Sequence, residues 1–159
     1  MAHLLERLAI HQVIGLDTSI FIYHLEANPR YLSLTSSVLK YIESGQGVGV
    51  ISTVVVMELT VHPWRINRGD IARQYEALLV NFPHLKIVEV SREVARQAAQ
   101  LRANYNLRPA DALQVATALV SGATAWVSND KQLKRLETVI EVLILEEFGA
   151  AKPESRTQP

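Results

Sequence analysis

The chain has 159 residues, of which sixteen are basic and sixteen acidic, so its formal net charge is zero. Its length predicts one domain, and 48% apolar with 20% charged residues is the composition of a globular protein. The absence of cysteine excludes disulfides and thiolate zinc sites, and it fits a cytoplasmic location. The N-terminus does not predict a signal peptide, and no apolar stretch is long enough to predict a membrane span.

Apolar runs separated by chain breakers predict alternating strands and helices in the first half of the chain. Pro29 and Pro83 end helices there, and Ser52 is a good N-cap for a helix that Pro63 closes or bends. The expected elements are a strand over 13–16, a helix over 18–25, a helix over 32–42, a strand over 48–51, a helix from Ser52 and a helix over 71–79.

The second half of the chain continues the alternation. Ser91 caps one helix, and Pro109 stands at the first helical position of another. The expected elements are a strand over 86–90, a helix from Ser91 to Tyr105, a helix from Pro109, a strand over 124–128, a short helix over 131–136 and a strand over 139–145. This order predicts one α/β domain over 1–149 with a mainly parallel sheet. We expect a disordered tail over 150–159 and assign no role to residues 1–12.

Four acidic residues stand at the junctions of the apolar segments: Asp17, Glu58, Asp111 and Asp130. Asp17 and Asp130 follow expected strands at the sheet edge where parallel sheets bind ligands. Asp111 lies in the first turn of a helix, and Glu58 could reach back toward the same edge. Buried carboxylates are costly unless a cation compensates them. Oxygen-only ligands suit Mg²⁺ or Mn²⁺, so the pattern predicts a metal-dependent enzyme.

Each acid also has an ordinary structural interpretation. Asp17 could be a helix N-cap, Glu58 could face solvent, and Asp111 is a common kind of first-turn residue. Asp130, after Ser-Asn, could be a turn residue. The recurrence of all four at the same kind of junction favours the metal site. The five histidines show no ligand spacing and are expected at the surface or in packing.

Four stretches around these acids resemble the PIN domain family of metal-dependent ribonucleases. They are Ile14-Gly-Leu-Asp-Thr-Ser-Ile20, Ser52-Thr-Val-Val-Val-Met-Glu-Leu59, Pro109-Ala-Asp-Ala-Leu-Gln-Val-Ala-Thr-Ala-Leu119 and Trp126-Val-Ser-Asn-Asp130. The resemblance implies a three-layer α/β/α fold and an endoribonuclease that hydrolyses RNA phosphodiester bonds with Mg²⁺ or Mn²⁺. It implies catalytic and metal-binding roles for Asp17, Glu58, Asp111 and Asp130. The matching polar residues expected to orient these acids are Thr18, Ser19, Ser128 and Asn129.

The resemblance also implies partners. Many small PIN-domain proteins are VapC-type toxins that a separately encoded antitoxin neutralises, and the family resemblance favours a homodimer. Residue by residue, Trp64, Ile66 and Tyr75 are first interpreted as core residues. The resemblance implies instead that the helices around them form a groove for the antitoxin.

Two features of the sequence bear on other functions. Gly45-Gln-Gly-Val-Gly49 precedes an expected strand, whereas a dinucleotide-binding loop follows one. The zero net charge argues weakly against nucleic acid, but sixteen bases face only twelve acids if a metal neutralises the four. The main alternative is a non-catalytic PIN-like module that binds RNA or protein. Such modules tend to lose acids from the cluster, and this chain has all four.

Overall fold

The computed structural model describes residues 2–149, so the tail expected to be disordered, 150–159, lies outside the described residues. The elements alternate as the sequence predicts. In chain order they are α1 (Ala2–Leu8), β1 (Val13–Leu16), α2 (Thr18–Leu25), α3 (Leu32–Glu43), β2 (Val48–Ser52), α4 (Thr53–Arg65), α5 (Gly69–Val80), β3 (Leu85–Val88), α6 (Arg92–Tyr105), α7 (Pro109–Val120), β4 (Ala125–Ser128), the 3₁₀ helix η1 (Lys131–Leu136), β5 (Glu141–Ile144) and the 3₁₀ helix η2 (Leu145–Phe148).

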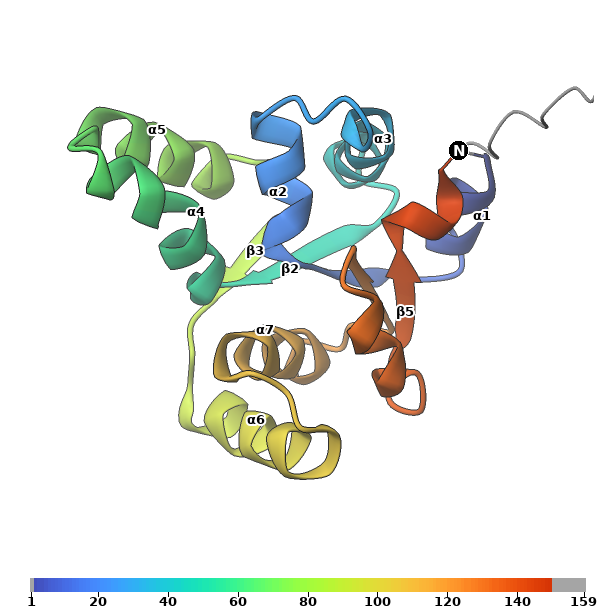
Figure 1. The fold of residues 1–159 in the computed structure, drawn as a ribbon. Coiled ribbons are helices and arrows are strands. Elements are labelled where there is room, and N and C mark those ends of the chain that lie inside the picture. The colour runs from blue at the N-terminus through green and yellow to red at the C-terminus, as the bar shows by residue number, and fades with distance from the viewer. Residues whose placement is uncertain (1, 150–159) are drawn as a thin grey trace, which may run out of the picture.

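The strands form one sheet in the order β3-β2-β1-β4-β5, and every neighbouring pair is parallel. Helices α2 to α5 lie on one side of this sheet, and α6 and α7 lie on the other (Figure 1). Because helices cover both faces, the strands are almost continuously apolar. The predicted three-layer α/β/α architecture with a parallel sheet is confirmed.

Two hydrophobic cores form, one on each face of the sheet. Ile14 and Leu16 of β1 pack into the core beneath α2 to α5, together with Val127 of β4. Trp126 belongs to the other core, which α6, α7 and η1 close. Alternate residues of a strand point to opposite faces, so neighbouring residues of β1 and β4 supply both cores.

Gly15 allows α7 to lie close against β1. A Cβ atom on Gly15 would meet the Trp126 ring at 2.6 Å and the Ala118 Cβ at 2.7 Å. No side chain fits in that space, so glycine is needed for this close approach. The approach brings the helix that carries Asp111 to the strand that Asp17 follows.

Residues 1–12, to which the sequence assigned no role, include a short helix. Leu4 and Leu8 of α1 are fully buried in the core that also contains α3. The following loop is attached to β5, because His11 contacts Thr124 at 2.8 Å and Glu141 at 2.5 Å. The expectation that histidines serve surface or packing roles is confirmed for His11.

The ends of several elements differ by one or two residues from the predicted ones, as at α5 and β5, and two differences are informative. Helix α4 continues through Pro63 to Arg65 and does not close there. A proline in the last turn removes only one backbone donor, and the amides of Ile66 and Arg68 still bond to His62 and Pro63. Strand β3 is shorter than expected and ends at Val88. In the part of the chain that the structure describes, no helix is long and apolar enough to cross a membrane.

Candidate active site

The candidate site lies where β1 and β4 end side by side. Asp17 directly follows β1, and Asp130 lies two residues beyond β4. From β1 the chain builds the sheet outward through β2 to β3, and then returns to add β4 on the other side of β1. Such a switch point at the carboxyl ends of parallel strands is the usual ligand site of this kind of sheet.

Asp17 occupies the N-cap position of α2, but its side chain makes no capping hydrogen bond. Instead, Ser128 Oγ donates a hydrogen bond of 2.5 Å to Asp17 Oδ2. Burial raises the pKa of Asp17, the Ser128 bond opposes this, and the negative charges of Asp111 and Glu58 raise the pKa further. Asp17 is therefore not an ordinary helix cap.

Glu58 points inward from the second turn of α4, and so does not face solvent. Ser52 caps this helix by accepting from the Val54 amide at 3.1 Å, as the sequence predicts. Glu58 Oε1 accepts from Thr18 Oγ1 at 2.7 Å and from the side-chain amide of Gln114. The carboxylate is thus held between α2 and α7.

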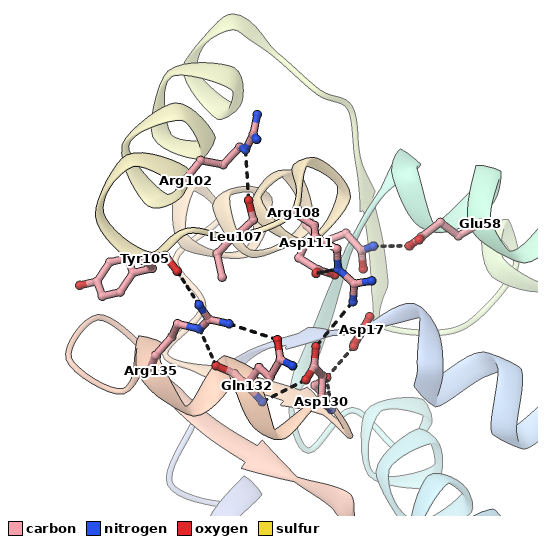
Figure 2. Close-up of polar contacts among 12 residues, drawn as sticks. Asp17, Glu58, Arg102, Tyr105, Leu107, Arg108, Asp111, Asp130, Gln132 and Arg135 are labelled. Carbon is pink, nitrogen blue, oxygen red and sulfur yellow. Dashed lines mark hydrogen bonds and ion pairs between the residues drawn. The ribbon is translucent and has the colours of Figure 1, made fainter.

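Asp111 and Asp130 share one arginine. Arg108 Nε donates to Asp111 Oδ2 at 3.2 Å, and Arg108 Nη2 lies 3.9 Å from Asp130 Oδ2. The other oxygen of Asp130 caps η1 by accepting from the Gln132 amide at 3.0 Å. Figure 2 shows the Arg108 guanidinium among the carboxylates of Asp17, Asp111 and Asp130.

Burial and the neighbouring charges shift the pKa of Asp111 in different directions. Burial raises its pKa, the Arg108 charge and hydrogen bond lower it, and the charges of Asp130 and Glu58 raise it again. The negative charges of Asp111 and Glu58 likewise raise the pKa of Asp17. The four acids therefore form one electrostatic unit, although they come from four separate segments of the chain.

The donor set fits a hard divalent cation such as Mg²⁺ or Mn²⁺. All four candidate ligands offer carboxylate oxygens, and their mutual repulsion is relieved by positive charge. Within residues 2–149, no three His, Asp or Glu side chains already stand close enough together to hold a metal ion. Asp111 and Asp130 face Arg108, and Glu58 faces Thr18 and Gln114, so side-chain rotation would be needed to complete a metal site.

The four polar residues expected to orient the acids make different contacts in the structure. Ser128 bonds Asp17 and also accepts from the Asp130 amide at 3.1 Å, so it links two of the acids. Thr18 contacts Glu58 through its hydroxyl, whereas we expected it to orient Asp17. Ser19 Oγ is buried, and no hydrogen-bond partner is found for it among the described residues.

Asn129 does not contact Asp130 through its side chain. Its amide nitrogen lies 3.4 Å from the Tyr23 hydroxyl, and its Oδ1 accepts from the Glu146 amide at 2.9 Å. Ser128, which was also expected to orient Asp130, does contact it, by accepting from its backbone amide. Asn129 does not, because alternate residues at a strand end point to opposite sides. Asn129 links the loop after β4 to α2 and η2.

Sequence reasoning missed two residues of the site, Gln114 and Arg108. Gln114 is buried and lies on α7 three positions after Asp111, on the same helix face. A buried glutamine among apolar residues was the available signal. No sequence pattern indicates the contact of Arg108 with Asp130.

Several cavities lie near the acids. One of about 270 Å³ is bordered by Asp111 and Asp130 together with Arg108 and Arg135. An apolar one of about 170 Å³ lies between α2, α4 and α5 and includes Glu58 in its wall. A larger cavity of about 670 Å³ beside α1 and β5 is not part of this set, because none of the four acidic residues lines it.

A sequence model of the PIN domain matches residues 14–139, which include all four acids. No curated protein sequence matches the chain.

Solved structures share the fold at low sequence identity. VapBC2 from Rickettsia felis, bound to a promoter DNA fragment, matches with 17% identity and a TM-score of 0.62, over 83% of this chain and 98% of that one. A toxin-antitoxin complex from Klebsiella pneumoniae matches with 18% identity and a TM-score of 0.61, over 84% and 97%. FitAcB from Neisseria gonorrhoeae matches with 19% identity and a TM-score of 0.61, over 84% and 98%.

Proposed function

The chain belongs to the PIN domain family, and from this premise we propose that it is a metal-dependent endoribonuclease. The observation that carries the proposal is the convergence of four carboxylates from separate segments. Burial is the main cause of the raised pKa values of Asp17 and Asp111, and the negative charges of the other acids raise both further. A stable fold alone would not place four mutually repelling acids together, because buried like charges are destabilising.

Each residue then has a defined task in RNA hydrolysis. Asp17, Glu58, Asp111 and Asp130 would hold Mg²⁺ or Mn²⁺. When bound, such an ion supplies an activated water and stabilises negative charge on the phosphate. Ser128 fixes the orientation of Asp17.

Polar neighbours on two helices complete this arrangement. Thr18 and Gln114 hold Glu58 at the site from two sides, through its Oε1 atom. Neighbours that orient metal ligands in this way commonly matter nearly as much as the ligands. No histidine is needed for proton transfer in this scheme.

The proposal is tested by incubating the purified protein with a mixed pool of single-stranded RNA. We expect cleavage with Mn²⁺ or Mg²⁺ and none with excess chelator. Asp17→Asn, purified in the same way, serves as the control for contaminating nucleases. Equal degradation with chelator, or by Asp17→Asn, would reject the metal mechanism.

We further propose that the protein is the toxin of a toxin-antitoxin pair and is neutralised by an antitoxin. Support comes from the fold shared with VapBC2 and with the Klebsiella toxin-antitoxin complex. The antitoxin would bind the apolar cavity between α2, α4 and α5, near Tyr75. Trp64 and Ile66, first considered core residues, are 56% and 53% exposed and so are available at this surface.

A homodimer is also proposed, on the basis of family membership and exposed apolar side chains along α4. Met57 and Trp64 are 58% and 56% exposed, and Val61 lies between them at 40%. These three residues follow helical spacing and form a stripe on one face. Light scattering at micromolar concentration should give a dimer, and a monomer under these conditions would reject this proposal.

The competing candidate is a PIN-like module that binds RNA or protein without catalysis. The complete set of four acids, with Ser128 and Gln114 in contact with two of them, favours the enzyme. Calorimetry separates the two candidates, since a binding-only module should show no saturable site for Mn²⁺.

A further inference from the structure

Arg108 occupies the space between two of the four acids. It is the residue before Pro109 at the N-cap of α7, and its guanidinium contacts Asp111 at 3.2 Å and Asp130 at 3.9 Å. The Arg108 side chain is 79% exposed, whereas those of Asp111 and Asp130 are only 22% and 32% exposed. The cation thus approaches the acids from the solvent side.

The backbone that carries Arg108 is held in place by two other arginines. Arg102 Nε donates to the Leu107 carbonyl at 3.1 Å, and Arg135 Nη1 donates to the Tyr105 carbonyl at 2.8 Å (Figure 2). Asn106 adopts a left-handed conformation at φ 53°, which completes the turn between α6 and α7. Any change in the partner of Arg108 therefore requires rotation of its side chain alone.

A guanidinium and a divalent ion compete for the same carboxylate oxygens, because both carry positive charge. Arg108 Nε and Nη2 both face Oδ2 atoms, one on Asp111 and one on Asp130. A divalent ion bound by these two Oδ2 atoms would repel the guanidinium, and the loss of its ion pairs would reduce the net affinity of the site for the ion. The freed side chain would remain at the rim of the cavity that Arg108 and Arg135 both border. Two arginines at one cavity offer positive charge that suits a phosphate.

We propose that Arg108 exchanges partners during the reaction cycle. It neutralises Asp111 and Asp130 in the metal-free protein, gives way to the divalent ion, and then binds a phosphate of the RNA. Arginine suits both tasks, because its planar fork matches carboxylates and phosphates alike. This inference rests on the proposed function and adds a positioning and substrate-binding residue to it.

The test compares Arg108→Gln with Arg68→Gln. Arg68 is a matched control, because it too is the N-cap residue of a helix and pairs with an aspartate of the first turn, Asp70. Mn²⁺ affinity is measured by calorimetry, and KM for a single-stranded RNA is measured at saturating Mn²⁺. Arg108→Lys keeps the charge but loses the fork, and it should fall between wild type and Arg108→Gln.

Arg108→Gln should bind Mn²⁺ about fivefold more tightly than wild type, the scale of an exposed ion pair. Its KM for RNA should rise about fivefold, so that the two ligands respond in opposite directions. Arg68→Gln should change neither value. A solely structural role for Arg108 would weaken binding of both ligands or of neither.

A second readout needs no catalytic activity. In nitrogen NMR spectra, Mg²⁺ titration should shift the Arg108 Nε–H signal and leave that of Arg68 in place. If wild type binds Mn²⁺ but Arg108→Gln binds it no more tightly, or has an unchanged KM, the exchange is rejected and the metal site stands. If wild type shows no saturable Mn²⁺ binding, the metal site is rejected, and the exchange with it.

Discussion

Two arginine–aspartate pairs of similar chemistry lie at the N-termini of α5 and α7, but the pKa of the aspartate is shifted in opposite directions in the two pairs. Arg68 pairs with Asp70 through two hydrogen bonds of 2.9 Å, and this lowers the pKa of Asp70 to about 2. Arg108 pairs with Asp111 at 3.2 Å, yet the pKa of Asp111 is raised. An arginine partner and a helix N-terminus therefore do not decide the state of the acid.

The surroundings of the two aspartates account for the difference. Asp70 is exposed, and its arginine is its only charged partner among the described residues. Asp111 is partly buried, and burial raises its pKa, as do the negative charges of Asp130 and Glu58. Burial and like charges outweigh one arginine at α7. Raised carboxylate pKa values of this kind cluster at functional sites, and a structural pair such as Arg68–Asp70 provides the reference.

The two aspartates should differ most in their effect on the rate of RNA cleavage. Asp111→Asn should lower the rate of RNA cleavage by about 1000-fold, since a lost ligand removes several kcal/mol of transition-state stabilisation. Asp70→Asn, which makes the same chemical change at the other helix, should leave the rate unchanged. Initial rates with Mn²⁺ provide the measurement. Equal rates for the two variants would show that the α7 pair is structural too.

The two aspartates should also differ in how much Mn²⁺ raises the thermal stability of their asparagine variants. Mn²⁺ at about 100 times its dissociation constant should stabilise wild type by about 2.7 kcal/mol, or roughly 5–10 °C in Tm. Asp70→Asn should show the same rise, and Asp111→Asn little or none. Melting curves with Mn²⁺ and with chelator give these shifts. A full rise in Asp111→Asn would remove Asp111 from the metal site.

The polar neighbours of the acids on α7 should also affect the rate of RNA cleavage, and Gln114 is the one to test. Gln114→Met keeps the side-chain size but removes the amide that bonds Glu58, so cleavage should slow about tenfold, as for other residues that orient ligands. Gln100→Met, at an exposed position of α6, is the matched control and should have no effect. Initial rates at saturating Mn²⁺ test this, and an unchanged rate for Gln114→Met would mean that Glu58 needs no such support.

The smallest expected effect is on the stability of the metal-free protein. Folding raises the pKa of Asp111 above its ordinary value of 3.8. At a pH between the unfolded-state and folded-state pKa, the folded protein therefore binds more protons than the unfolded chain. Wild-type stability contributed by this group therefore falls as pH rises through that window. Asp111→Asn lacks this loss and should be about 1 kcal/mol more stable at neutral pH.

The pH dependence supplies the control for this prediction. The advantage of Asp111→Asn should disappear below the unfolded pKa, where Asp111 is protonated in both states. Asp70→Asn should gain nothing at neutral pH, because the pKa of Asp70 is lowered by folding. Urea unfolding at several pH values, with chelator present, measures both variants. A destabilised Asp111→Asn at neutral pH would contradict the raised pKa.

Features encoded by local sequence were predicted well. The strands before Asp17 and Asp130 are apolar runs, and the helix caps Ser52 and Ser91 accept the expected amide bonds. These signals depend on residues within a few positions of one another. The order of elements then places strand ends at one edge of the sheet, so the location of the acids could be inferred as well.

Features that depend on distant partners were not predicted. The Gln114–Glu58 bond joins residues 56 positions apart, and α1 is stabilised by burial of Leu4 and Leu8 against later elements. A helix of seven residues has little stability of its own, so its sequence gives a weak signal. Side-chain direction at Asn129 likewise follows from the twist and register of the sheet, which the sequence does not state.

The central claim is that four acids from separate segments act as one divalent-ion site. A calorimetric titration with Mn²⁺ of wild type, Asp17→Asn and Asp70→Asn tests it most directly, since Asp17 lies on a different element from Asp111 but shares its charge environment. Saturable binding by wild type and Asp70→Asn, with affinity at least about tenfold weaker in Asp17→Asn, is the predicted result. Equal affinity in Asp17→Asn and wild type, or no saturable binding by wild type, would contradict the claim.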